Sequence, residues 1–220
     1  MNAIEPQRRR GRQSAETAAR TRQAIVEAAT ECFSRQGYEA TSVREIAQSA
    51  HLTHGTLRHH FGSKLEIWKA VADTVLEYYQ AKLMPVMAAE GMQNGQEPNP
   101  LQDFQQVVRA FIEASYSNPV FAKLLMGESQ TDNERAAHMR NNFLSLHQPI
   151  GILFGQAQAH CKALKPYSND SFFLALLSLT FFPLMFPGIQ SLLGETTTAP
   201  TSYQVERIMG ILFDDVQTGS

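Results

Sequence analysis

The sequence predicts an all-α protein of about nine helices, and three observations support this fold class. Apolar residues recur every three or four positions along most of the chain, which is the spacing of one helix face. Ser-x-x-Glu patterns and an Asn-Pro pair are typical of helix starts. No stretch alternates apolar and polar residues as a half-buried strand does. With 220 residues, the chain is long enough for one large or two small domains.

The first segment is polar and basic. It contains "RRRGR" at residues 8–12 but no apolar stretch of a secretory signal, and we expect a flexible basic arm over residues 1–19. The two cysteines, Cys32 and Cys161, are far apart and fit no metal-ligand spacing. Such cysteine usage is typical of a reduced, cytoplasmic protein.

Short helices follow the arm. A helix that begins at Thr21 ends near Gly37, and Ser42 with Glu45 forms a capping box for a second helix. Thr53 caps a third. Ser63 and Glu66 form a second capping box, before a fourth helix that runs to about Pro85. We assign residues 20–66 to one domain and 67–220 to another.

The later part of the chain continues the helical pattern. Residues 91–100 are a loop by composition. Helical spacing then resumes at Leu101, and Asn118-Pro119 begins a further helix. The remaining predicted helices cover about 131–164, 169–186 and 201–216.

Charge is distributed unevenly between these parts. Residues 1–64 contain ten Lys or Arg and six Asp or Glu, whereas residues 65–220 contain nine and fifteen. Four of the seven His also lie in the first part. The asymmetry indicates that the N-terminal part binds an anion, with a chance distribution as the alternative.

The third helix has one apolar face and one polar face. If Leu57 and Phe61 point inward, a rotation of about 100° per residue turns Gly55 and His59 outward. Glycine weakens a helix but permits close approach of another molecule to the backbone. The flanks and edges of this face carry Thr56, Arg58, His54 and His60.

Metal binding by these histidines is excluded by geometry. Two His ligands on one helix usually stand four residues apart, but the position four after His54 is Arg58. His54 and His59 are separated by about 140° around the axis. A solvated polar face is the remaining simple alternative. Two short helices joined by a tight turn favour a helix-turn-helix instead, whose second helix enters the DNA major groove.

At this point the stretch "ATECFSRQGYEATSVREIAQSAHLTHGTLRHHFGSKLEIWKAV", residues 29–71, resembles the DNA-binding domain of the TetR family of bacterial transcription regulators. The matched elements are the Gly-Tyr turn, "TSVREIA", "GTL" followed by Phe61, "SK" and the apolar fourth helix. The resemblance implies a helical ligand-binding and dimerisation domain after the DNA-binding helices. It also implies that a ligand moves the fourth helix and lowers affinity for a two-site operator.

The resemblance extends to individual contacts. Arg58 stands where the family usually has Tyr, His60 where it often has Tyr, and Leu65 replaces an acidic residue. We expect the arm arginines at 8–12 to add minor-groove or phosphate contacts. The residues expected to read or position DNA are Arg44, Thr53, His54, Gly55, Thr56, Arg58 and His59. Those expected on phosphates are Thr41, Ser42, His60 and Lys64.

The segment 172–186 is apolar on all sides. Its 15 or so residues reach about 22 Å, which is short of a membrane core of roughly 30 Å. We therefore expect no membrane span. The resemblance implies that the last two helices, over 172–192 and 205–216, form a homodimer interface.

The middle helices are expected, again by resemblance, to hold a pocket for an unknown small molecule. Plain core packing is the alternative for each candidate, and an apolar ligand fits their composition. The candidates are Phe104, Phe111, Tyr116, Phe121, Met126, Met139, Phe143, His147 and Phe154.

Other function classes have less support. The sequence contains no G-x-S-x-G, H-E-x-x-H or P-loop motif, so we expect neither an enzyme nor a cofactor. The remaining alternatives are a non-specific nucleoid-type DNA-binding protein and, less favoured, an all-α enzyme.

Overall fold

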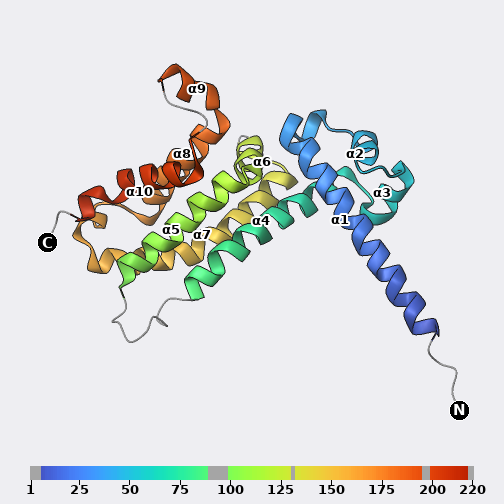
Figure 1. Ribbon diagram of the computed structural model, residues 1–220, viewed down its shortest axis with the longest axis horizontal. Helices are drawn as coiled ribbons and strands as arrows, with labels where there is room; N and C mark the ends of the chain where they lie inside the picture. The colour runs from blue at the N-terminus through green and yellow to red at the C-terminus, as the bar shows by residue number, and fades with distance from the viewer. Residues whose placement is uncertain (1–5, 89–98, 130–131, 195–198, 218–220) are drawn as a thin grey trace, which may run out of the picture. The chain divides into compact units, whose positions relative to one another are not determined.

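The structure is a computed structural model that describes residues 6–88, 99–129, 132–194 and 199–217 (Figure 1). These segments contain ten α-helices, one short 3-10 helix and no strand, which confirms the predicted all-α class. The predicted loop falls largely on residues 89–98, which lie outside the described residues. The helices are α1 Pro6–Ala40, α2 Val43–Ser49, α3 His54–Phe61, α4 Lys64–Ala88, α5 Pro100–Ser117, α6 Val120–Glu128, α7 Glu134–His160, η1 Lys162–Leu164, α8 Asn169–Met185, α9 Pro187–Leu192 and α10 Thr201–Gln217.

Helix α1 differs from the prediction at its start and agrees with it at its end. The sequence predicts a flexible arm over 1–19, but the helix begins at Pro6. Ala, Gln, Glu and Arg, which dominate residues 7–20, are strong helix formers, and this favours continuation of the helix. Near the other end Gly37 is non-helical, with φ 79° and ψ 173°, as the predicted stop requires.

The chain forms two compact units. We call residues up to Asp73, together with Asn133–Arg135, the N-terminal unit, and Thr74–Asp132 with Ala136–Ser220 the C-terminal unit. Helices α4 and α7 therefore each contribute residues to both units. This division falls inside α4, after Asp73, and Trp68 and Val71 in the first turns of α4 are buried.

The core of the N-terminal unit is small and apolar. Helix α1 packs against α2, and α2 packs against α3. Ile25 on α1, Ile46 on α2 and Leu57 on α3 each have no exposed surface. Burying a side chain of this size contributes about 1.5–3 kcal/mol, so Leu57 fixes which face of α3 turns inward.

The core of the C-terminal unit is aromatic. Helix α5 packs against α8 and α10 (Figure 1). The Phe104 ring lies 5.2–6.1 Å from the rings of Phe154, Phe172 and Phe213, distances at which tilted aromatic pairs attract. The buried Tyr79 hydroxyl donates to Ser115 Oγ at 3.0 Å, and burial raises the pKa of Tyr79.

The apolar segment after residue 169 forms two helices rather than one. Helix α8 ends at Met185, and α9 begins at Pro187. A residue before proline is disfavoured in the α conformation, and Phe186 has φ −127° and ψ 62°. Ser168 caps α8, its Oγ accepting from the Ser171 amide at 3.1 Å. Among the described helices, none has the length and apolarity needed to cross a membrane.

Candidate nucleic-acid interface and apolar pocket

Helices α2 and α3 begin at side-chain caps that the sequence predicts. Ser42 Oγ accepts from the Glu45 amide at 3.1 Å, and Thr53 Oγ accepts from the Thr56 amide at 3.1 Å. Each bond satisfies one of the free amides of a helix start. Between the helices His51 has a positive φ of 55°, which makes the turn tight.

The outer face of α3 is polar and solvent-exposed, as the sequence predicts. Leu57 and Phe61 are buried on its inner face. On the outer side His54, Gly55, Arg58 and His59 are exposed, whereas Thr56 and His60 are half-buried. The Thr53 and Thr56 hydroxyls share a hydrogen bond at 2.9 Å, and the His59 and His60 rings meet edge to face.

Gly55 is not required by the packing of α3 itself. A Cβ placed on it would lie 3.7 Å from Thr53 Oγ, which is ordinary van der Waals contact. The protein therefore has room for a methyl group here. Because Gly55 has no such methyl group, the α3 backbone is accessible to a molecule outside the protein.

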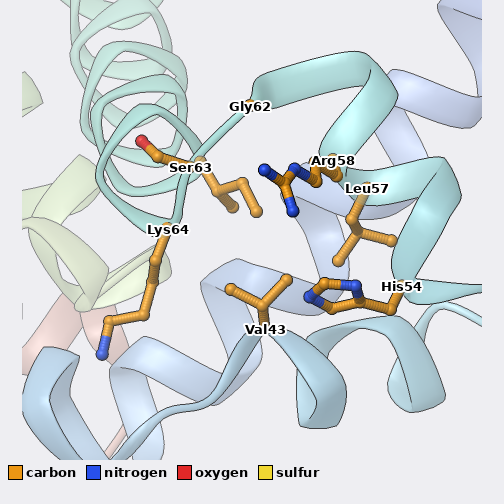
Figure 2. Close-up of a pocket in the computed structure, with 8 residues that line it drawn as sticks. Val43, His54, Leu57, Arg58, Gly62, Ser63 and Lys64 are labelled. Atoms are coloured by element: carbon orange, nitrogen blue, oxygen red, sulfur yellow. The ribbon is translucent and has the colours of Figure 1, made fainter.

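A hollow of about 200 Å³ lies beside α3 and the start of α4. Figure 2 shows the Arg58 guanidinium reaching into it, on the side of Ser63. Ser63 caps α4, its Oγ accepting from the Glu66 amide at 3.2 Å. A cation beside a helix start favours an anionic partner.

Two predicted phosphate contacts point inward instead. Thr41 is 2% exposed, and its hydroxyl donates to the Gly37 carbonyl at 2.7 Å. Lys64 Nζ donates to the carbonyls of Tyr38 and Thr41 at 2.7 and 2.8 Å. Burial lowers the pKa of Lys64. These two side chains brace the turn between α1 and α2, and the prediction that they face DNA needs this correction.

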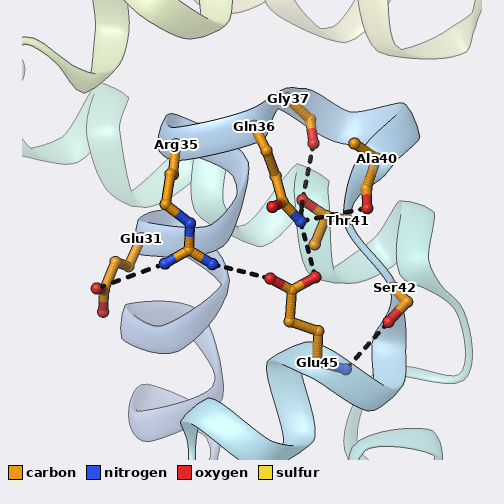
Figure 3. Close-up of polar contacts among 8 residues, drawn as sticks. All are labelled: Glu31, Arg35, Gln36, Gly37, Ala40, Thr41, Ser42 and Glu45. Carbon is orange, nitrogen blue, oxygen red and sulfur yellow. Dashed lines mark hydrogen bonds and ion pairs between the residues drawn. The ribbon is translucent and has the colours of Figure 1, made fainter.

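Side chains of α1 also hold α2 in place (Figure 3). The Glu45 carboxylate accepts from Arg35 at 2.8 Å and from Gln36 at 2.7 Å. Gln36 also donates to the Ala40 carbonyl at 3.2 Å. The predicted capping box is therefore half formed, because the Glu45 side chain binds α1 rather than the Ser42 amide. Arg35 and Gln36 were missed because their partner lies nine or ten residues away.

Most of the predicted DNA contacts remain accessible, on α2, on α3 and at their N-terminal caps. Ser42, Arg44, Thr53, His54, Gly55, Arg58 and His59 are exposed. The side chains of the arm arginines lie outside the described residues. Among the described residues, no group of three His, Cys, Asp or Glu could hold a metal ion.

The C-terminal unit has an apolar pocket of about 590 Å³ between α6, α7 and α8. Met126 and Phe143 line it, as the sequence predicts. Ser129 and Ser178 are its polar lining residues, and no charged residue lines it. The pocket also has lining residues that the sequence did not predict as ligand contacts. Most of them lie in the segment 172–192 predicted as a dimer interface. They are Leu125, Leu174, Leu177, Leu179, Phe181, Phe182, Met185 and Phe186.

The other predicted pocket residues do not line this space. His147 lies behind Phe143, stacked on its ring at 5.6 Å and within 3.1 Å of the Asn169 amide nitrogen. Tyr116 is half-buried. The remaining candidates are buried in the core, namely Phe104, Phe111, Phe121, Met139 and Phe154.

Several large apolar side chains of the last helices are exposed. On α8, Leu174 is 66% and Phe182 50% exposed, and Ile211 on α10 is 63% exposed. Isolated exposed apolar residues are ordinary, but such a group on neighbouring helices is typical of a protein interface. Others in the same part of the chain are Phe186, Ile189, Leu192, Leu193 and Tyr203.

Comparisons with known proteins agree with this arrangement. Residues 25–71 match the family described as bacterial regulatory proteins, tetR family. The chain is 28% identical over 146 residues to the transcriptional regulator SrpR of Pseudomonas putida, covering 63% of each. It is 30% identical over 145 residues to the repressor BepR of Brucella suis, covering 62% of this chain and 66% of BepR. The matches thus span less than two thirds of either relative.

The fold is also similar to solved structures. The structure of the fatty acid degradation regulator FadR from Bacillus halodurans matches with a TM-score of 0.66 and 13% identity. The match covers 87% of this chain and 94% of FadR. At this identity the likeness concerns the fold.

Proposed function

We propose that the chain is a sequence-specific DNA-binding transcriptional regulator of the TetR type, because residues 25–71 match that family and SrpR and BepR are similar over much of this chain. We propose that the protein is a repressor, and that binding of a small apolar ligand releases it from its operator. The observation that carries the proposal is the two-sided α3, with Leu57 and Phe61 buried and a polar face exposed. Its location is the cytoplasm, where the DNA lies.

The exposed face of α3 is the surface that enters the major groove. A groove about 12 Å wide accepts one helix, and base edges there offer hydrogen-bond acceptors and donors. His54, Arg58 and His59 supply the polar groups, with Thr53, Thr56 and His60 beside them. Arg44 reaches from α2, and Ser42 lies at the α2 start, where helix amides favour a phosphate.

The exposed apolar residues of α8 and α10 support a homodimer. A second copy would cover Ile211 on α10, and on α8 it would lie against Leu174 and Phe182, which also line the apolar pocket. A two-fold dimer places two α3 helices on half-sites about one DNA turn, or about 34 Å, apart.

The apolar pocket supports a small effector. Its volume of about 590 Å³ is within the usual range of ligand sites, about 300–1,000 Å³. Since no charged residue lines it, an uncharged apolar molecule fits best. Helix α4 contributes residues to both units, and ligand binding acts through it on the orientation of α3. Thermodynamic linkage then requires that DNA lower the affinity for the ligand by the same factor by which the ligand lowers the affinity for DNA.

A selection of full-length protein on random duplexes tests the proposal. Fluorescence anisotropy then measures the dissociation constant for the selected duplex and for a scrambled one. A regulator should differ by roughly a thousandfold or more between them. Near-equal values would instead support the second candidate, a non-specific DNA-binding protein favoured by the basic N-terminal part.

Arg58→Ala tests the α3 face within the same assay. We expect affinity for the selected duplex to fall by about 5- to 150-fold for each half-site, the effect of losing one contact worth about 1–3 kcal/mol in each copy. Arg140→Ala is the matched control, because Arg140 is an equally charged, exposed residue on α7. Equal losses in both variants would mean that net charge, not the α3 face, determines binding.

A further inference from the structure

The first turn of α7 belongs to the N-terminal unit although the rest of α7 does not. Glu134 accepts a hydrogen bond from Lys69 of α4. Arg135 donates to Glu39 at 3.0 Å, and its guanidinium lies 3.8 Å from the centroid of the Tyr38 ring. The Arg135 side chain is only 14% exposed. This arginine therefore contacts the end of α1 from a position 96 residues further along the chain.

Tyr38 carries a second cation. Lys64 Nζ lies 4.0 Å from the same ring centroid and donates to the Tyr38 carbonyl at 2.7 Å. Two cations near one ring repel each other, and Arg135 contributes to the lowered pKa of Lys64 after burial. The Glu39 carboxylate beside Arg135 compensates part of this repulsion. Tyr38 is thus the meeting point of residues from α1, α4 and α7.

Tyr38 lies in the turn that determines where α2 begins. The Thr41 amide donates to the Tyr38 carbonyl at 3.2 Å, and Lys64 donates to the Thr41 carbonyl. Gly37 begins the turn with its positive φ, and Ser42 ends it as the cap of α2. A displacement of Tyr38 would therefore displace Ser42 and the start of α2.

We propose that Arg135 is a positioning residue for DNA binding, which holds Tyr38 and with it the turn that presents α2 and Ser42. The proposal rests on the proposed function of the N-terminal unit. Arg135 itself does not contact DNA. Helix α7 continues from Arg135 to Phe143, which lines the apolar pocket.

The contact with the ring, rather than the ion pair, should matter most. Glu39 is 83% exposed, and ion pairs with exposed carboxylates are screened and contribute little. A guanidinium over a ring at 3.8 Å, with little water access, interacts more strongly. Arg135→Met removes the cation but keeps most of the aliphatic volume, whereas Arg135→Lys keeps a cation.

The experiment measures operator affinity of full-length variants over a range of salt concentrations. The duplex is the one that wild type selects from random DNA. We expect Arg135→Met to weaken binding roughly 2- to 30-fold without changing the slope of log affinity against log salt. Arg135→Lys should restore most of the affinity. Arg140→Met, which removes an exposed cation from the same helix, should bind like wild type.

Four results would overturn the proposal. Unchanged affinity of Arg135→Met would show that the turn does not need Arg135. A salt slope reduced by about 0.9 per copy would show a phosphate contact instead of positioning. A loss that Arg135→Lys fails to restore, with a lower urea midpoint, would show a purely structural role. If wild type binds the selected duplex no more tightly than a scrambled one, the proposed function fails, and the inference fails with it.

Discussion

Gly55 allows a test in which stability and DNA binding should change in opposite directions. It is the second residue of α3, it is exposed, and a Cβ there would have Thr53 Oγ as its nearest neighbour at 3.7 Å. Gly55→Ala therefore causes no clash inside the protein. The added methyl group would lie on the face that we propose to enter the groove.

The structure sets the size of both effects. Alanine is better than glycine in the middle of a helix by about 0.5–1 kcal/mol, which is the upper limit for Gly55 in the first turn of α3. For a chain of this length that gain corresponds to a rise in Tm of roughly 1–4 °C. If DNA lies against the α3 backbone, the methyl group overpacks the interface and costs about 1–3 kcal/mol per copy, or about 5- to 150-fold in affinity.

Gly127→Ala is the matched control. Gly127 lies inside α6, and a Cβ there meets nothing within 4 Å. We expect both variants to gain thermal stability by circular dichroism, but only Gly55→Ala to lose affinity for the selected duplex by anisotropy. Full operator affinity in a folded Gly55→Ala protein would refute the close approach of DNA to α3.

Two further substitutions test the C-terminal unit. Ile211→Glu places a charge on the exposed apolar surface of α10, where Ile211 is 63% exposed and lies outside the apolar pocket, and should convert the dimer to a monomer in analytical ultracentrifugation. Ile152→Glu, at a similarly exposed position on α7, should remain a dimer, and a dimeric Ile211→Glu would exclude this face as the interface. Tyr79→Phe removes the bond to Ser115, whose hydroxyl still donates to the Phe111 carbonyl at 2.8 Å. It should lower the free energy of unfolding in urea by about 0.5–1.5 kcal/mol, and no change would mean that this buried bond is not stabilising.

The features that the sequence predicts well are local ones. Helical periodicity, the caps Ser42 and Thr53, and the stop at Gly37 each depend on residues within one or two turns of each other. The orientation of α3 also follows from two residues four positions apart, Leu57 and Phe61. All of these agree with the structure.

The apolar pocket was harder to predict, for a physical reason. Aromatic residues on apolar helix faces fill the core and line pockets alike, and periodicity does not separate the two. Phe104 and Phe111 have the spacing of pocket residues, yet each is surrounded by other rings. Phe143 has the same pattern but lies where α6, α7 and α8 leave space. Only the packing of separate helices determines this difference.

Lys64 shows how a long-range contact changes the electrostatics of the candidate interface. Its sequence context predicts a phosphate contact, but its ammonium binds carbonyls 23 and 26 residues earlier in the chain. Of the predicted contacts, Arg44 and Arg58 then remain as the exposed, permanently charged side chains. Each phosphate contact contributes about 0.9 to the salt dependence of binding, so these two account for a shallow dependence. A steeper one would require further cations, from the arginines at 8–12 or from the exposed Arg20 and Arg22, because Lys64 is already bonded within the protein.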